Sequence, residues 1–255
     1  MKNAVILCAG LGKRLLPLTE DKPKCLVEVG AAPMLYYSIK ELIANGFKQI
    51  VLVTGYKKER IQSFIFNYFG QSSATFTFLP NPEYDTKNNL YSVYIAKEFF
   101  DDETLLLNSD ILYDPEILKR AVVQLEAGHD DSFLVVDDVK PLAQEEMKVI
   151  TNGNGKIVDI GKWLEPSKSL GEYIGIMHLR GEGRDKFFVE SSKMLSNGET
   201  DKYYEDALHR VCRQISLVPV STKGMHWTEV DDHKDLQKAK DIALKIIKEI
   251  PEDVS

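Results

Sequence analysis

The clearest candidate for chemistry is a group of glycines and cations that follows the first apolar segment of the chain. Residues 4–8 (AVILC) are apolar throughout and indicate a buried strand. Glycines directly after such a strand let backbone N–H groups approach a phosphate chain closely, and neighbouring cations balance its charge. A simple glycine turn would explain the glycines but not the cations, so we expect a polyphosphate site. Its residues are Ala9, Gly10, Gly12, Lys13, Arg14 and Lys24.

Two common glycine motifs do not account for this site. A Walker loop requires a second glycine followed by Lys and then by Ser or Thr, and no such run occurs here. The dinucleotide-binding fingerprint requires a third glycine where this chain has Leu15. The glycines and cations therefore follow neither pattern.

Acidic residues at two places far apart in the chain each follow a segment that is expected to form a strand. Asp110 comes after residues 104–108 (TLLLN), and Asp231 and Asp232 come after residues 227–230 (WTEV). Because ligands of an open α/β sheet bind beyond the carboxyl ends of its strands, these carboxylates should face the glycine-rich site. A single Asp after a strand is also typical of a turn or a helix cap, and from the residues alone that alternative is favoured for Asp110.

Strand and helix patterns alternate over the first half of the chain, which indicates a parallel sheet with helices on both faces. We therefore predict an α/β fold with a doubly wound, mostly parallel sheet. Strands are expected at residues 4–8, 49–54, 75–79 and 104–108, and helices at 33–45, 57–69, 89–99 and 115–126, the last opened by Asp114 and Pro115.

From residue 132 onward the pattern changes to shorter segments that are richer in strands. A hairpin is favoured at residues 152–155, which read Asn-Gly-Asn-Gly. With no linker or repeat in the sequence, we expect a single domain over residues 1–255, with a first half at about 1–130 and a small β-rich lobe plus C-terminal helix at about 131–255. Strands are expected at 132–137, 148–151, 156–160, 172–179 and 215–220, and helices at 186–195, 203–214 and about 234–250.

Composition excludes several classes of protein. A formal net charge of -7 argues against nucleic acid as the main partner. The three cysteines, Cys8, Cys25 and Cys212, contain no C-x-x-C pair and indicate neither a zinc site nor a disulfide framework. No signal peptide precedes the first strand and no apolar run is long enough to cross a bilayer, so we expect a cytoplasmic protein without membrane insertion. The sequence gives no indication of the oligomeric state.

The glycine-rich segment resembles the signature of the nucleotidyltransferases that act on sugar-1-phosphates and related phosphate esters. In that family a buried strand is followed by a glycine-rich run ending in Arg-Leu, then by P-x-T, and then by PKxL. Lys13 before the arginine is a departure that is common within the family. The matching positions are Ala9, Gly10, Gly12, Arg14, Leu15, Pro17, Thr19, Pro23, Lys24 and Leu26.

The resemblance implies a Rossmann-like nucleotidyltransferase fold and a magnesium site. Such enzymes hold catalytic Mg²⁺ with an Asp in the position of Asp110 and a second carboxylate at a strand end just before the last helix. Asp231 fits this second position best, and Asp232 stays possible because its side chain can instead cap the helix. Arg14 and Lys24 would then stabilise the leaving pyrophosphate and the pentavalent phosphorus.

Residues 88–92 (NNLYS) lie where many members of the family have a turn that contacts the base. The NN-x-x-S form resembles the branch that uses CTP, the phosphocholine cytidylyltransferases and their aminoethylphosphonate and inositol-phosphate relatives. Amides and a hydroxyl both donate and accept hydrogen bonds, which distinguishing cytosine from uracil requires. From the residues alone, helix capping by the asparagines is equally favoured. The resemblance favours base contact by Asn81, Asn88, Asn89 and Ser92.

The β-rich lobe resembles the same branch and would hold the acceptor. Lys162 would bind the acceptor's phosphate or phosphonate, and aromatic faces with a carboxylate would enclose a cationic head group. The alternative is that the aromatic side chains are core and the carboxylates are surface charge. The acceptor-binding residues are expected to be Glu146, Lys162, Tyr173, Tyr204 and Trp227.

Taken over nearly the whole chain, the resemblance implies a Mg-dependent cytidylyltransferase. It would transfer CMP from CTP to a small phosphate or phosphonate monoester, such as phosphocholine or 2-aminoethylphosphonate, and release pyrophosphate. One alternative is a sugar-1-phosphate nucleotidylyltransferase that uses UTP, dTTP or GTP. Another is a non-catalytic nucleotide sensor on the same fold, which the presence of both Asp110 and Asp231 disfavours.

Overall fold

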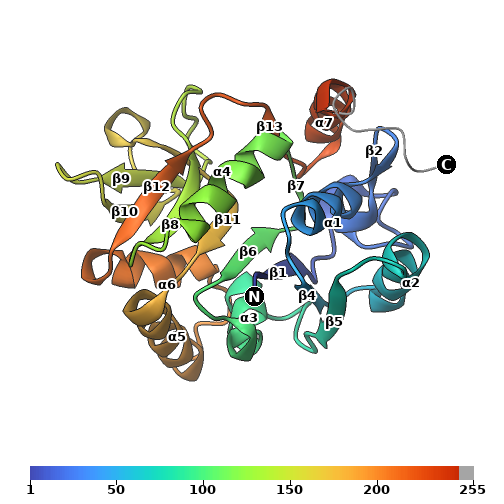
Figure 1. The fold of residues 1–255 in the computed structure, drawn as a ribbon, viewed down its shortest axis with the longest axis horizontal. Helices are drawn as coiled ribbons and strands as arrows, with labels where there is room; N and C mark the ends of the chain where they lie inside the picture. Colours follow the sequence, from blue (N-terminus) through green and yellow to red (C-terminus); the bar gives the residue numbers. More distant parts are fainter. Residues whose placement is uncertain (247–255) are drawn as a thin grey trace.

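The computed structural model describes residues 1–246, and a mixed sheet of nine strands lies at its centre (Figure 1). Four neighbouring strands run parallel, and their side chains are mainly apolar because helices pack on both faces of the sheet. In spatial order they are β6 (Thr104–Asn108), β1 (Asn3–Cys8), β4 (Gln49–Thr54) and β5 (Thr75–Pro80). The predicted α/β fold with a mostly parallel central sheet is confirmed.

Helices pack on both faces of this parallel core. Ala4 and Ile6 of β1 belong to the core cluster on one face, whereas Val5 belongs to the cluster on the other, as the alternation of side chains along a strand requires. The first face is covered by α1 (Met34–Ala44), α2 (Lys58–Phe69) and α4 (Pro115–Glu126), and the second by α3 (Asn89–Ile95), α5 (Gly181–Ser196) and α6 (Tyr204–Val211).

The second half of the chain extends the sheet through antiparallel pairings. β11 (Gly171–His178) pairs antiparallel with β6 of the parallel core, and also with two strands of the second half. The predicted β-rich character of this half is confirmed, including the hairpin at residues 152–155. Its other strands are β8 (Ser132–Asp137), β9 (Lys148–Thr151), β10 (Ile157–Gly161) and β12 (Leu217–Ser221).

A separate two-stranded ladder lies beside the main sheet, and only one of its two strands was predicted from the sequence. β13 (Trp227–Glu229) lies within the short strand expected at residues 227–230. Its antiparallel partner β7 (Ile111–Tyr113) was not predicted, because its three residues are all apolar and buried and show no alternation. A second short ladder joins β2 (Glu28–Val29) to β3 (Ala32–Pro33). The last described element is α7 (His233–Ile246), and the part of the predicted helix at residues 247–250 lies outside the described residues.

Three other predictions can be compared with the structure. The expected helices at 89–99 and 203–214 each end early and continue as a turn of 3₁₀ helix, Lys97–Phe99 and Cys212–Gln214. Asp114 caps α4 by accepting a hydrogen bond from the Glu116 N–H at 2.9 Å. All three cysteines are free and buried. Within residues 1–246, no helix has both the length and the apolar character that crossing a membrane requires.

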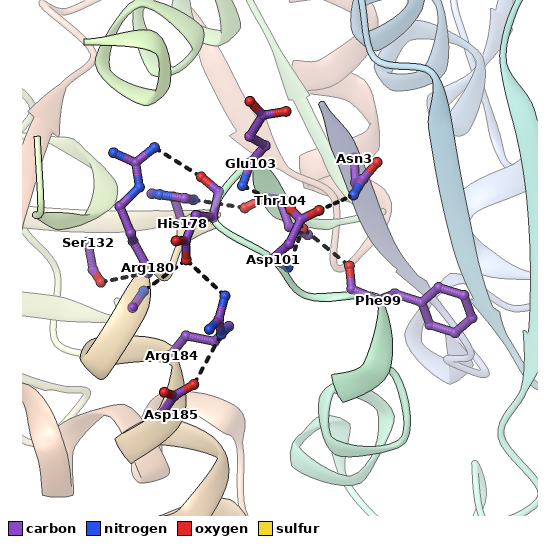
Figure 2. Close-up of polar contacts among 12 residues, drawn as sticks. Asn3, Phe99, Asp101, Glu103, Thr104, Ser132, His178, Arg180, Arg184 and Asp185 are labelled. Carbon is purple, nitrogen blue, oxygen red and sulfur yellow. Dashed lines mark hydrogen bonds and ion pairs between the residues drawn. The ribbon is translucent and has the colours of Figure 1, made fainter. Parts of the chain in front are cut away.

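A polar network ties the two halves together where β1 and β6 begin and β11 ends (Figure 2). The Asp102 carboxylate accepts hydrogen bonds from the Gly181 N–H at 2.9 Å and from Arg184 at 2.8 Å, at the start of α5. The Arg180 guanidinium donates to the backbone carbonyls of Asp102 and Leu125 at 2.9 and 3.1 Å. These contacts fix α5 against the turn before β6.

His178 lies within this network and is almost fully buried. Its Nδ1–H donates to the Thr104 carbonyl at 2.9 Å, and within residues 1–246 its buried Nε2 has no hydrogen-bond partner. Burial, helped by the nearby Arg180 charge, lowers the pKa of His178 to about 4. The folded protein therefore keeps this imidazole neutral at a pH where the unfolded chain would protonate it.

We expect His178 to make the protein less stable as the pH falls. Between pH 6.5 and 4 the unfolded chain binds a proton that the folded protein excludes, so the free energy of unfolding should decrease by about 2 kcal/mol from pH 7 to pH 5 through this group. In H178N the amide can still donate a hydrogen bond to the Thr104 carbonyl, but the side chain no longer binds a proton. Urea unfolding at both pH values should show a smaller pH dependence for H178N than for the wild type. H129N, which replaces an exposed imidazole, should keep the wild-type dependence, and equal slopes for wild type and H178N would contradict the assignment.

Candidate active site

A cleft of about 670 Å³ opens beyond the carboxyl ends of the parallel strands, between the two halves of the chain. Most of the candidate site residues predicted from the sequence line this cleft, and they come from both halves of the chain. Those that line it are Ala9, Gly10, Arg14, Lys24, Asn88, Asn89, Ser92, Asp110, Glu146, Lys162, Tyr173, Trp227 and Asp231. The side chains of Lys13, Asn81 and Tyr204, and Gly12, lie outside this lining.

The β7–β13 ladder brings Asp110 and Asp231 together. Ile111 pairs with Glu229 at one end of the ladder, and the Val230 N–H donates to the Asp110 carbonyl at 2.9 Å. Asp110 immediately precedes β7 and Asp231 closely follows β13, so antiparallel pairing places both at the same end. The position of each carboxylate therefore depends on the strand next to the other carboxylate.

Lys24 joins these two carboxylates. Its Nζ lies 2.8 Å from Asp110 Oδ2 and 2.7 Å from Asp231 Oδ1. Burial alone would lower the pKa of Lys24, but the two carboxylates outweigh it and raise the pKa well above its usual range. On its exposed side, Asp231 also pairs with Arg14 at 2.9 Å. Lys24 and Arg14 therefore place two positive charges directly beside the acidic residues.

Glu229 is a third carboxylate at this position, which the sequence reasoning did not single out. Carboxylate oxygens of Asp110, Glu229 and Asp231 all lie within 4.8 Å of one another. Enclosure by the cleft walls and the two neighbouring aspartates raise the pKa of Glu229 to about 8, although its side chain remains exposed to solvent on one side. Alternation along β13 puts residues 229 and 231 on one face, and this is the signal in the sequence that could have identified Glu229.

The acidic trio of Asp110, Glu229 and Asp231 has the chemistry of a hard-cation site. Asp110 Oδ1 is buried and, within residues 1–246, has no hydrogen-bond partner, so one ligand oxygen remains available. Clustered carboxylate oxygens are the ligands that Mg²⁺ and similar cations take. These residues therefore fit a divalent cation.

Asp232, the alternative to Asp231 in the sequence, has a different environment. Its Oδ1 accepts hydrogen bonds from the backbone N–H groups of Lys234 and Asp235 at 2.7 and 3.0 Å. These contacts are those of a residue capping the start of α7, and they lower the pKa of Asp232. The structure thus places Asp231 in the cleft and Asp232 on the helix end.

The glycine loop, residues 9–14, is held in shape by tight contacts. Gly12 adopts a left-handed conformation with φ of +65°, and a Cβ there would lie only 2.9 Å from the Lys24 Cβ. Its carbonyl accepts a hydrogen bond from the buried Thr19 hydroxyl at 2.9 Å. Leu15 follows the loop directly and is fully buried. It packs in a core cluster with Val230, which follows β13, and with residues of α7. Gly12 therefore allows Lys24 to approach, and Leu15 anchors the loop to the end of the chain.

The asparagines predicted to contact a base also support the fold. Asn88 caps α3 by accepting from the Asn89 N–H at 2.8 Å, and Asn89 Oδ1 accepts from the Tyr204 N–H at 3.0 Å. Buried Asn81 donates to the Ser92 hydroxyl at 2.9 Å and stands behind it. Capping is therefore present, while Asn88, Asn89 and Ser92 still border the cleft and have further hydrogen-bonding capacity.

Two of the predicted acceptor-binding residues, Glu146 and Trp227, lie with Glu172 around a cation of the protein itself. Lys140 Nζ lies 3.0 Å from Glu146 Oε1, contacts the Glu172 carboxylate, and lies 4.7 Å from the centre of the Trp227 ring. The Trp227 indole N–H is fixed by Asp137 at 2.6 Å. No pattern in the sequence indicated Lys140, because its loop carries no periodicity. We call Glu146, Glu172 and Trp227 the acidic–aromatic box.

Tyr204 lies one layer behind the cleft and supports its wall. Its side chain is fully buried, and its hydroxyl lies 2.9 Å from the Tyr173 hydroxyl and donates to Asn108 Oδ1 at 3.2 Å. Tyr173 itself borders the cleft, as does Tyr203, which was not singled out from the sequence. The Tyr203 ring lies 5.7 Å from Lys162 Nζ.

Lys148 shapes the loop that carries Glu146. Its side chain is fully buried, and its ammonium donates to the carbonyls of Gln144, Glu146 and Lys162 at 2.6, 2.9 and 2.8 Å. A buried ammonium normally needs such a full set of acceptors. One side chain therefore sets the positions of two cleft-lining segments.

Chemically, the cleft has two distinct ends. One combines the glycine loop with Arg14, Lys24 and the acidic trio, which together suit a polyphosphate with a divalent cation. The other combines Lys162, carboxylates and aromatic rings, which suits a small charged molecule. Such a cleft can hold a phosphate chain and a second reactant side by side.

Comparison with protein families matches residues 3–159 to the family described as Nucleotidyl transferase. The choline-phosphate cytidylyltransferase of Streptococcus pneumoniae is 26% identical over 241 residues, 94% of this chain and 97% of that protein. The CTP:phosphoglutamine cytidylyltransferase of Campylobacter jejuni is 29% identical over 262 aligned residues, 92% of this chain and 98% of that protein.

Other relatives are longer than this chain. The bifunctional IPC transferase and DIPP synthase of Aquifex aeolicus is 29% identical over 250 residues, and this chain spans 52% of its length. The chain likewise spans 23% to 53% of several other curated relatives that it matches.

Solved structures share the fold along nearly the whole chain. A CTP:phosphocholine cytidylyltransferase from Streptococcus pneumoniae has a TM-score of 0.78 at 24% identity and covers 95% of this chain and 99% of its own. A putative glucose-1-phosphate thymidylyltransferase from Bacillus anthracis has a TM-score of 0.79 at 21% identity, with coverage of 100% and 97%. Because the family match extends over more than half of the residues, this chain belongs to the nucleotidyl transferase family.

Proposed function

We propose that this enzyme transfers CMP from CTP to a small phosphate or phosphonate monoester and releases pyrophosphate. The nucleotide binds to the first half, about residues 1–130, and the acceptor to the lobe at about 131–255. The observation that carries the proposal is the position of Lys24, held between Asp110 and Asp231 where the glycine loop meets the cleft.

Nucleotidyl transfer requires positioning and charge neutralisation rather than a protein nucleophile. An oxygen of the acceptor's phosphate attacks the α-phosphorus of CTP, and the bond from that phosphorus to the bridging oxygen of the β-phosphate breaks. Negative charge then increases on the departing pyrophosphate. The glycine loop N–H groups bind the phosphates, and Lys24 and Arg14 stabilise the charge of the leaving group.

Mg²⁺ is the cation that we propose for the acidic trio. Bound there, it would neutralise phosphate charge and polarise the α-phosphoryl group. Asp110 and Asp231 would be its main ligands, with Glu229 beside them. The orphaned Asp110 Oδ1 and the clustering of three carboxylates support this assignment.

CTP is the proposed nucleotide because of the residues at the α3 end of the cleft. Asn88, Asn89 and Ser92 offer amide and hydroxyl groups that can bind the amino group and ring nitrogen of cytosine. Relatives that align along almost their whole length with this chain are named for CTP or for cytidylyl transfer. The proposed acceptor is small and cationic, with Lys162 at its phosphate or phosphonate.

The first test measures pyrophosphate release with CTP, UTP, dTTP and GTP against a panel of phosphate and phosphonate monoesters. We expect CTP to exceed UTP by at least tenfold in kcat/KM, because uracil would leave polar groups of the base site unpaired. Equal use of UTP and CTP, or best turnover with glucose-1-phosphate, would instead favour a sugar-1-phosphate nucleotidylyltransferase. Absence of turnover with every pair would contradict the proposal.

The second prediction concerns Lys24. In K24A the single-turnover rate should fall about a hundredfold, or about 3 kcal/mol of transition-state stabilisation, while nucleotide affinity changes much less. K22A, which removes a cation two residues away and outside the cleft lining, should keep the wild-type rate. Loss of affinity with an unchanged rate would make Lys24 a binding group only.

The third prediction distinguishes Asp231 from Asp232. Titration of Mn²⁺, followed by electron paramagnetic resonance, should show at least tenfold weaker binding to D231N than to the wild type. D232N should bind Mn²⁺ normally and remain folded, because Asn also caps a helix. The reverse pattern would assign the metal to Asp232.

A further inference from the structure

Glu205 is a carboxyl of the cleft whose environment the fold alone does not explain. It lies in the first turn of α6, lines the cleft beside Tyr173, and is 6% exposed. Within residues 1–246 its buried Oε2 has no hydrogen-bond partner. Buried polar atoms in native proteins are nearly always paired, so an unpaired carboxylate oxygen beside a cleft points to a donor on the ligand.

Two hydroxyl groups lie nearby, those of Tyr173 and Tyr204, and the Tyr204 hydroxyl is close to the Glu205 carboxyl, but each donates its proton to another oxygen. Tyr204 donates its one hydroxyl proton to Asn108 Oδ1, so the short contact between the two phenols is a donation from Tyr173 to Tyr204. Burial raises the pKa of Glu205 to about 7. Its own backbone N–H, the Tyr204 hydroxyl and Lys162 oppose this increase, whereas nearby Asp206 adds to it. A cationic donor would stabilise the ionised carboxyl in this place.

Two other carboxylates at the acceptor end, those of Glu146 and Glu172, already share a cation. Lys140 fills the acidic–aromatic box, where it pairs with Glu146 and Glu172 above the Trp227 ring. A trimethylammonium group would need such an aromatic surface and has no N–H to donate. It would therefore meet an occupied box and leave Glu205 unpaired.

We propose that Glu205 recognises an N–H group of the acceptor, so that the preferred acceptor carries a protonated primary or secondary amine rather than a quaternary ammonium. This inference rests on the proposed function, since it specifies the acceptor of that same cleft. Lys162, in the same lining, would face the acceptor's phosphate or phosphonate. The two charges would then match the two ends of a small zwitterion.

Phosphoethanolamine and phosphocholine test this directly, because they differ only in three N-methyl groups. With CTP, the wild type should show at least tenfold higher kcat/KM for phosphoethanolamine. E205Q should lose at least tenfold with phosphoethanolamine, mainly through KM, and change little with phosphocholine. E165Q, which removes an exposed carboxylate outside the cleft lining, should behave as the wild type.

The pH profile separates recognition from a structural role. Because Glu205 ionises between pH 6 and 8, the ratio of the wild-type kcat/KM to that of E205Q with phosphoethanolamine should increase over this range. Titration of the acceptor's own phosphate affects both enzymes equally and therefore cancels in this ratio. A ratio that does not depend on pH would contradict the proposal. K140Q should raise kcat/KM for phosphocholine severalfold by emptying the box, and no increase would overturn the exclusion of quaternary amines.

Binding measurements keep this inference distinguishable from the proposed function. Calorimetry with each compound, in the presence of a non-hydrolysable CTP analogue, should show tighter binding of phosphoethanolamine to the wild type and no such preference in E205Q. Preferential binding without turnover would contradict the proposed reaction and support the role of Glu205. Equal binding of both compounds, or a preference that persists in E205Q, would overturn it.

Discussion

The cleft depends on one ammonium group that is shared by two carboxylates. Lys24 pairs with Asp110, 86 residues away, and with Asp231, 207 residues away. A partly buried charge is tolerable only when it is well paired, and here each partner compensates the others. Both the approach of Lys24, which Gly12 permits, and the β7–β13 ladder, which fixes the aspartates, are needed for this arrangement. Local backbone geometry at two distant places therefore determines the electrostatics of the site.

The sequence predicted those parts of the site that are fixed by a buried strand. Asp110 follows the apolar run at 104–108, and the glycine loop follows the run at 4–8, so strand periodicity located both. β7 was missed because its three residues are all apolar and buried, so they show no alternation. Its partner strand was expected, but the pairing that brings Asp231 to Asp110 could not be deduced from one segment alone.

Side-chain partners were less predictable than strands. The asparagines at 88 and 89 would occur in the sequence whether they capped a helix or contacted a base, and the structure shows capping alongside exposure to the cleft. Lys140 and Lys148 look alike as surface lysines, yet one lies over Trp227 and the other is fully buried among carbonyls. Such differences arise from loop conformation, which hydrophobic periodicity does not encode.

The core cluster around Leu15 also has a consequence for how the protein is made. It joins residues next to the glycine loop with Val230 and with Leu236, Ala239 and Ala243 of α7. The first half of the chain can form its parallel strands early in synthesis, because β1, β4, β5 and β6 all lie within the first 108 residues. Leu15 can pack early against Val27, Val29 and Met34, but the part of this cluster that α7 supplies is added only after residues 233–246 have been synthesised. A nascent chain would thus hold its four parallel strands before Asp231 is present, so the complete cleft would form only after residue 231 has left the ribosome.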